Sequence, residues 1–155
     1  PAYLFTGDVL DIPIVGGAAG YGSNAHAAIE FYVIEGAGKV YGVSTLVGEE
    51  TERRVRDEIL AREVDVIRVV GKKQPIRVFA LLGEKDAVPA EEMERTARFG
   101  RALETYRARR FSEAAALFDA LAGDPVAAVY AGRARRSAVS PPPDDWDGVF
   151  ELDKK

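Results

Sequence analysis

The sequence predicts an α+β fold, in which a strand, a helix and a two-stranded antiparallel hairpin are followed by a helical extension. From Val43 to Leu82 the apolar residues occur in short β-branched runs, and from Val88 onward they recur at helical spacing. With 47% hydrophobic and 30% charged residues, the 155-residue chain has the composition of a globular protein with one ordinary core. We expect a sheet domain in residues 1–83, a helical extension in 84–139 and a tail in 140–155.

Residues 1–34 carry few structural signals. The run Val9–Val15 is apolar but contains Pro13, which favours an edge strand or an irregular segment. The glycines of Gly16–Gly22 invite a phosphate-loop interpretation, but no Lys-Ser/Thr pair closes the segment, so a flexible connection is the better interpretation. The single histidine, His26, stands beside alanines, and we assign it no chemistry.

The middle of the chain predicts a strand, a helix and a hairpin. The run Val43–Val47 is typical of a strand, and Gly48–Asp57 has the spacing of a short surface helix. Two strand-like runs follow, Val64–Val70 and Ile76–Leu82, and the short loop between them predicts an antiparallel hairpin. Its first strand has one apolar and one mixed face, made of Val64, Val66, Arg68 and Val70 on one side and Asp65, Ile67 and Val69 on the other.

The helical part predicts three helices. Pro89, followed by two glutamates, is typical of a helix start, and Arg107–Arg110 places basic residues at the end of that helix. The expected inner face of this first helix comprises Met93, Ala97, Phe99, Gly100, Leu103 and Tyr106. That of the second comprises Phe111, Ala114, Ala115, Phe118 and Leu121. Asp124 and Pro125 start the third helix, whose inner face carries Val126, Val129 and Tyr130.

The first two helices resemble one tetratricopeptide helix pair in the spacing of Tyr106, Phe111, Ala114 and Phe118. A single pair cannot bury both of its faces, so we expect it to pack on the preceding sheet or on a partner. Two interpretations follow, a structural brace and a regulatory or dimer-contacting module, and the brace is favoured.

The tail begins where Ser140–Pro143 ends helical structure. The only tryptophan, Trp146, follows two aspartates and precedes Phe150. One interpretation is a docking tag, and the other is a chain end anchored by burial of Trp146 and Phe150. We prefer the anchor.

The net charge and the amino-acid composition limit the partners and the cellular compartment that we expect. A net charge of −4 gives no reason to expect nucleic-acid binding. Cysteine is absent, which fits a cytoplasmic protein, and no apolar run is long enough to cross a bilayer, although a longer protein could be membrane-associated. Because the chain begins at Pro1, we expect a piece of something longer.

Three segments resemble the closing part of the class III adenylate/guanylate cyclase homology domain. Members of that family run "EGANKxYG", "ILVSEET" and "V+VKGKxxPVxVYEL" in this order. The corresponding segments here are Glu35–Gly42, Leu46–Thr51 and Val70–Leu81. The ending "PPPDDWDGVFEL" is similar to the C-termini of bacterial cyclases that carry a tetratricopeptide-like extension.

The resemblance implies a ferredoxin-like sheet and a head-to-tail homodimer that converts ATP to cyclic AMP and pyrophosphate with Mg²⁺ or Mn²⁺. It implies metal-binding aspartates on earlier strands, and an asparagine and an arginine on a helix before the "EG" motif. Here Phe31–Ile34 runs straight into Glu35, and that helix is missing. Loss of one such transition-state contact costs on the order of a hundredfold in rate, so we expect the chain as it stands to be inactive.

Two residues of this chain match positions that have a function in the family. Lys72 lies at the glycine-lysine turn that in the family reaches the terminal phosphates of the nucleotide, although a solvated turn lysine beside Lys73 is the favoured interpretation for an isolated chain. Tyr32 falls where the family places a threonine or aspartate that contacts the base. We assign no catalytic and no metal-binding residue to this chain.

Two hypotheses of different class remain. The first is that the chain is the C-terminal portion of a cyclase whose other residues lie outside this chain. The abrupt junction at Ile34–Glu35 then marks either residues that were dropped from the chain or a relative that has lost its catalytic activity. The second is a non-catalytic, cyclase-like module that dimerises or docks a sensor or regulatory partner. The missing asparagine and arginine helix discriminates between them.

Overall fold

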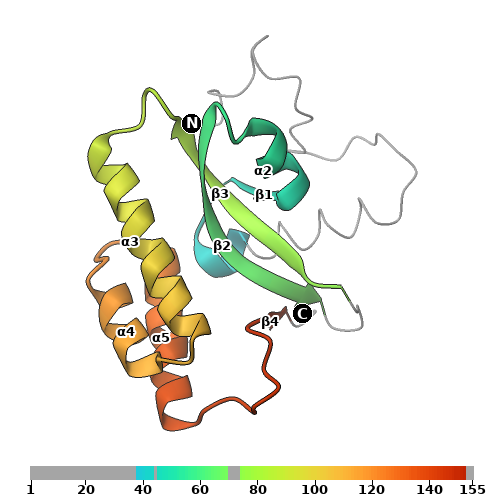
Figure 1. Ribbon diagram of the computed structural model, residues 1–155, viewed down its shortest axis with the longest axis vertical. Coiled ribbons are helices and arrows are strands. Elements are labelled where there is room, and N and C mark those ends of the chain that lie inside the picture. The colour runs from blue at the N-terminus through green and yellow to red at the C-terminus, as the bar shows by residue number, and fades with distance from the viewer. Residues whose placement is uncertain (1–37, 44, 70–73, 153–155) are drawn as a thin grey trace.

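The computed structural model describes residues 38–43, 45–69 and 74–152 (Figure 1). It confirms the predicted α+β class, because a four-stranded mixed sheet is followed by three helices that pack together. In chain order the elements are β1 (Leu46–Gly48), α2 (Glu49–Val55), β2 (Ile59–Val69), β3 (Ile76–Glu84), α3 (Ala90–Arg107), α4 (Phe111–Asp119), α5 (Pro125–Val139) and β4 (Phe150–Leu152).

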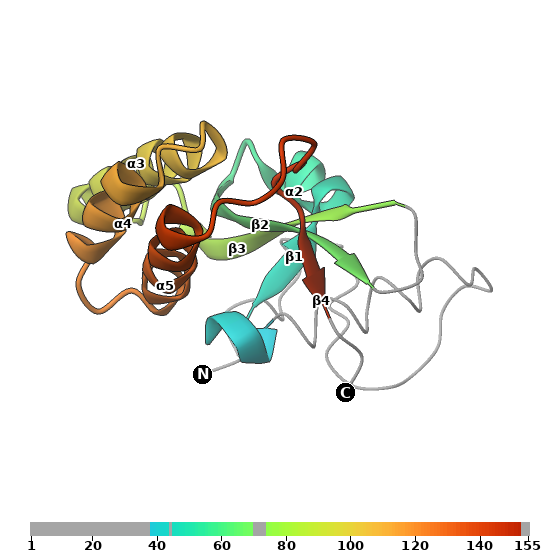
Figure 2. The same ribbon diagram turned by 90° about the horizontal axis from the view of Figure 1, so that it is seen from below.

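The strand order in the sheet is β1-β3-β2-β4. Antiparallel pairing places Leu46 of β1 opposite Ala80 of β3, and β2 pairs antiparallel with β3 as the predicted hairpin. The tail supplies β4, which runs parallel to β2 with Phe150 opposite Ile67 (Figure 2). A parallel strand at this edge was not predicted, because three residues carry no periodic signal.

The first hairpin strand differs from its prediction in length and in its buried face. It begins at Ile59 instead of Val64, and a register shift between Glu63 and Asp65 marks a β-bulge opposite β3. A bulge inserts an extra residue, so the side chains beyond it change face. Asp65 and Ile67 are consequently buried, whereas the expected alternation had put them opposite Val64.

The face predicted for the second helix is buried, and in α5 Val126 and Tyr130 are buried while Val129 is half-buried. Of the face predicted for α3, Phe99, Leu103 and Tyr106 are buried and the rest is not. Met93 is 43% exposed and Ala97 is exposed, and the buried stripe of α3 begins at Phe99. The first turns of α3 reach α4 through arginines instead, since Arg95 donates to the Ala122 carbonyl and Arg98 to the Ala120 carbonyl. Polar contacts with the end of a neighbouring helix thus replace the expected apolar ones.

One hydrophobic cluster joins the helices to the sheet. The aromatic rings of Phe99, Phe118 and Tyr130 pack together, with centroids 5.0–6.0 Å apart, and the same cluster includes Val64 and Val78 of the hairpin. The division into domains at residues 83 and 139 stays a prediction. No helix in the described ranges is long and apolar enough to span a membrane.

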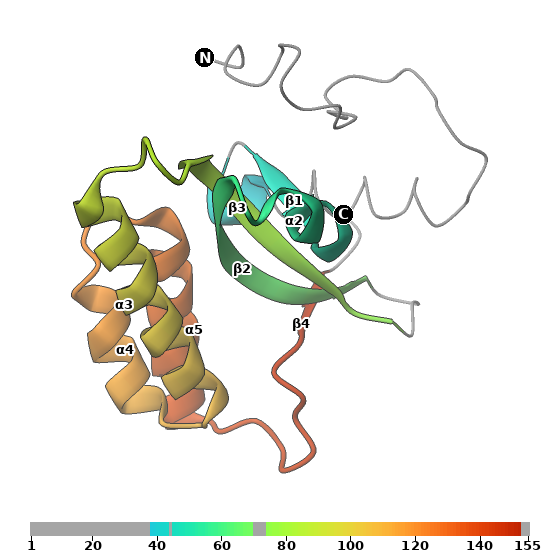
Figure 3. The ribbon, with the colours of Figure 1, turned by 45° about the horizontal axis from the view of Figure 1, so that its top comes forward.

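After α5 the tail turns back to the sheet and forms β4 there (Figure 3). The Trp146 ring lies 5.5 Å from the Tyr106 ring and 5.8 Å from the Phe111 ring, measured between centroids. The Phe150 ring lies beneath the guanidinium of Arg133, which is 3.6 Å from the ring centroid. These contacts anchor the end of the chain as the anchor interpretation expected, but Trp146 and Phe150 are half-buried instead of buried.

Candidate functional site

A buried polar network ties the hairpin to α5. Asp65 of β2 is 1% exposed, and its Oδ2 accepts a hydrogen bond of 2.6 Å from Nη1 of Arg133 on α5. Nη2 of Arg133 donates to the phenolic oxygen of Tyr41 over 3.0 Å, and the Tyr41 hydroxyl donates to Asp65. Tyr41 is fully buried in a helical turn formed by residues 38–41. The three side chains therefore form a closed triangle.

The charges in this triangle balance. A buried carboxylate and a buried guanidinium are each costly alone and become acceptable as a hydrogen-bonded pair. Burial, and then the nearby Asp65 carboxylate, raise the pKa of the Tyr41 phenol far above its ordinary range, so the phenol keeps its proton and acts as a donor. The Arg133 guanidinium also lies 5.2 Å from the centroid of the Tyr130 ring, which adds a cation–π contact.

A pocket of about 190 Å³ opens beside this network, between α5 and the tail. Asp65 and Arg133 border it, and aromatic rings from α3 and the tail form its walls. Its full lining is Asp65, Tyr106, Arg133, Arg136, Ser137, Trp146, Gly148, Val149 and Phe150. The pocket thus combines apolar walls with a few polar groups, as small-molecule sites do.

A second buried ion pair joins β2 to the start of α5. Arg62 donates to the carboxylate of Asp124, and the same carboxylate caps α5 by accepting from the backbone N–H groups of Val126 (2.9 Å) and Ala127 (3.1 Å). Burial alone would raise the pKa of Asp124. The Arg62 and backbone hydrogen bonds outweigh burial and lower that pKa, which keeps the carboxylate charged.

A second hollow, of about 180 Å³, lies between β2 and α3. Two buried polar atoms at this hollow, Nε of Arg62 and Oγ1 of Thr96, have no hydrogen-bond partner within the described part of the chain. Buried polar groups are normally satisfied by protein or water, and a hollow of this size has room for bridging water. We assign this hollow no ligand.

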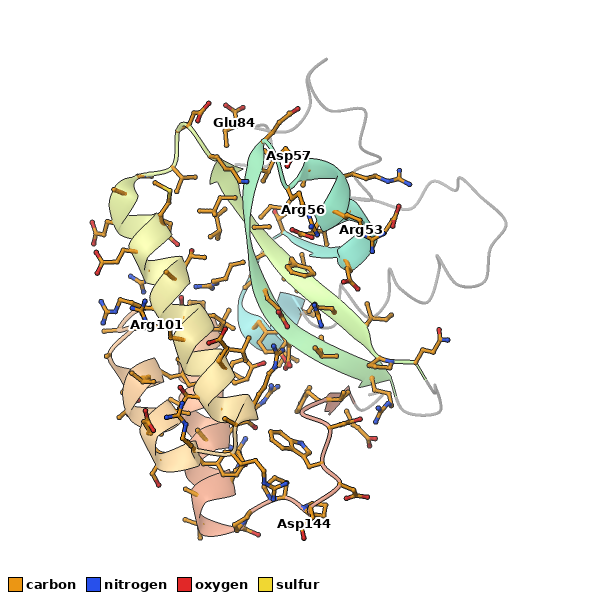
Figure 4. All side chains as sticks on the ribbon, viewed as in Figure 1. Arg53, Arg56, Asp57, Glu84, Arg101 and Asp144 are labelled. Atoms are coloured by element: carbon orange, nitrogen blue, oxygen red, sulfur yellow. The ribbon has the colours of Figure 1, made fainter. Side chains whose placement is uncertain are left out.

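Other exposed charges lie on α2 and on the outer face of α3. Figure 4 shows Arg53 on α2, Arg56 directly after α2 and Arg101 on α3, the last on the opposite side of the molecule. Arg53 pairs with Glu50 and Arg56 with Glu52 at helical spacing. Surface pairs of this kind contribute little to stability.

The two residues that carry over from the family, Lys72 and Tyr32, lie outside the described residues, as do the Gly16–Gly22 segment and His26. Their roles stay predictions. In the described ranges no three His, Cys, Asp or Glu side chains are grouped to hold a metal ion. The described residues therefore do not fit the Mg²⁺ or Mn²⁺ pair that the resemblance implies.

The sequence analysis missed the network of Tyr41, Asp65 and Arg133. Two signals could have found it. Asp65 is an acid inside an apolar strand, and Arg133 stands three residues after Tyr130, on the inner face of α5. An acid and a base on two buried faces of one small core must either pair or remain unsatisfied.

With the geometry of the site known, the comparisons add no family. The chain matches no protein-family model, no curated protein and no solved structure. The function must therefore be argued from the residues themselves.

Proposed function

We propose that this chain is the C-terminal portion of a class III adenylate/guanylate cyclase homology domain with a ferredoxin-like sheet, joined to a tetratricopeptide-like helical extension. The motif segments Glu35–Gly42, Leu46–Thr51 and Val70–Leu81 support it in sequence and order. The antiparallel pairing of β1 with β3 is compatible with it, since two of those segments would share one sheet. In this proposal the protein acts in the cytoplasm.

One observation carries the proposal furthest: Tyr41, the tyrosine of the "EGANKxYG" motif, is fully buried and bonded to both Asp65 and Arg133. The side chain of Arg133 on α5 thereby links this motif to the helical extension. A helical extension that is fastened in this way would serve the cyclase domain as a brace.

The intact enzyme would be a homodimer with an attached sensor or regulatory domain. It would convert ATP to cyclic AMP and pyrophosphate by attack of the ribose 3′-hydroxyl on the α-phosphate, with Mg²⁺ or Mn²⁺ supplying charge neutralisation when bound. Of the groups in this chain, Lys72 would bind the terminal phosphates and Tyr32 would lie near the base. The chain by itself lacks the family's catalytic asparagine and arginine.

The first prediction concerns turnover. Incubated with ATP and Mn²⁺, the chain should form no cyclic AMP above the level of the Lys72→Ala variant, as measured by mass spectrometry. The product of the complete gene should form cyclic AMP, and Lys72→Ala should reduce that rate because a cation on the phosphates is lost. Lys73→Ala is the matched control and should leave the rate nearly unchanged.

Two results would count against the proposal. Cyclic AMP formation by the chain itself, well above Lys72→Ala, would contradict its predicted inactivity. No cyclic AMP from the complete gene product would favour the second candidate, a non-catalytic cyclase-like module that dimerises or docks a sensor. The absence of the asparagine and arginine helix between Ile34 and Glu35 is the observation that keeps this candidate open.

A further inference from the structure

We propose that the pocket between α5 and the C-terminal tail binds a small planar organic carboxylate. This ligand would lie against the aromatic walls, with its carboxylate on Arg136. The inference rests on the charge, the walls and the size of the pocket, and it holds whether or not the chain derives from a cyclase.

The charge of the pocket favours an anion. Asp65 and Arg133 neutralise each other, with 2.6 Å between Oδ2 and Nη1. Arg136 also lines the pocket, and among the described residues its guanidinium makes no hydrogen bond or ion pair. Its neighbour Arg135 is paired with Asp119 over 2.5 Å. Within the lining this leaves one net positive charge, which disfavours a metal cation and suits a monoanion.

The walls favour a flat ligand with an apolar body. Tyr106, Trp146 and Phe150 border the pocket, and the Tyr106 and Trp146 rings meet edge to face at an interplanar angle of 87°. Stacking on aromatic rings stabilises a bound ligand whose body is planar.

The size of the pocket sets an upper limit on the ligand. Drug-sized ligands occupy pockets of about 300–1,000 Å³. The volume here is about 190 Å³, which suits a single ring with one carboxylate and is too small for a whole nucleotide.

Trp146 is the only tryptophan of the chain and borders the pocket, so its fluorescence reports binding directly. We would titrate the full chain with benzoate as the probe and with benzamide as its uncharged counterpart. Benzoate should change the Trp146 emission with saturation, at a dissociation constant of about 1 mM or tighter. Benzamide should bind at least about tenfold more weakly, because it cannot form the charge-assisted hydrogen bond.

Two variants make the test specific. Arg136→Gln should weaken benzoate binding at least about tenfold, whereas Arg135→Gln, the adjacent arginine paired with Asp119, should leave it unchanged. Both side chains are exposed, so circular dichroism should show the fold retained in each variant. The absence of a saturable response to benzoate would overturn the proposal. An equal response in Arg136→Gln, or equal affinity for benzamide, would overturn it as well.

Discussion

At the residue scale, Gly100 is a glycine without a structural need for one. It lies inside α3, and a Cβ built there meets nothing within 4 Å. Glycine in a helix interior is about 0.8–1.0 kcal/mol less favourable than alanine. We therefore expect Gly100→Ala to raise the free energy of unfolding by about 1 kcal/mol in urea denaturation, followed by circular dichroism.

Gly42 provides the contrasting control. Its φ is +64°, and an added Cβ would lie 3.2 Å from Cβ of Pro125. A residue with a side chain pays about 1–2 kcal/mol in the left-handed region. Gly42→Ala should therefore lower the free energy of unfolding. Equal effects of the two substitutions would contradict the local geometry described for both glycines.

The charge of Asp124 predicts a pH dependence. Its pKa in the folded chain is lowered, because the hydrogen bonds from Arg62 and the backbone outweigh burial. A carboxyl group whose pKa is lower in the folded chain than in the unfolded chain stabilises the fold. This stabilisation is fully present above the pKa in the unfolded chain, about 3.9, and is lost as the pH falls through the pKa in the folded chain. Unfolding free energies measured from pH 5 downward should therefore fall more steeply for the natural chain than for Asp124→Asn.

Asparagine keeps the capping function, because its side-chain oxygen can accept from the same N–H groups. The comparison therefore isolates the charge that faces Arg62. Parallel pH profiles for the two proteins would contradict a lowered pKa at Asp124.

At the scale of elements, the pair of Asp65 and Arg133 decides how β2 and α5 meet. Removal of one member of a buried pair leaves the other charged and unsatisfied, at a cost of about 3–5 kcal/mol. Arg133→Met and Asp65→Leu should each lower the free energy of unfolding by about that amount. The double variant should lose much less than their sum, because no lone charge remains.

The matched control is the exposed pair of Arg135, on the same helix as Arg133, and Asp119 of α4, with side chains 59% and 49% exposed. Its removal should cost at most about 1 kcal/mol. Strict additivity of the two substitutions at Asp65 and Arg133 would show that these side chains act separately.

At the scale of the whole molecule, the core is one cluster that runs from the sheet to the helices. Two of the pairs that cross between them, Arg62 with Asp124 and Asp65 with Arg133, are buried. Elements that share one core unfold together. We expect the urea transitions of Trp146 fluorescence, which reports the tail and helices, and of the far-ultraviolet circular dichroism to coincide. Two separate transitions would instead support a division into domains near residue 83.

The sequence by itself determined the elements whose signals are local. The hairpin of β2 and β3, the inner faces of α4 and α5, and the cap at Asp124 follow from periodicity, a short loop and a capping residue. Each of these depends on residues only a few positions apart, so one stretch of chain contains the whole signal.

Tertiary structure alone decided the rest. The bulge that turns Asp65 inward, the parallel pairing of β4 with β2, and the shift of the α3 stripe to Phe99 depend on partners far away in the sequence. The same holds for Tyr41, Asp65 and Arg133, which lie 24 and 68 positions apart along the chain and meet in one triangle. A buried charge acquires its partner only when the chain folds, because the core that excludes water also brings the opposite charge within reach.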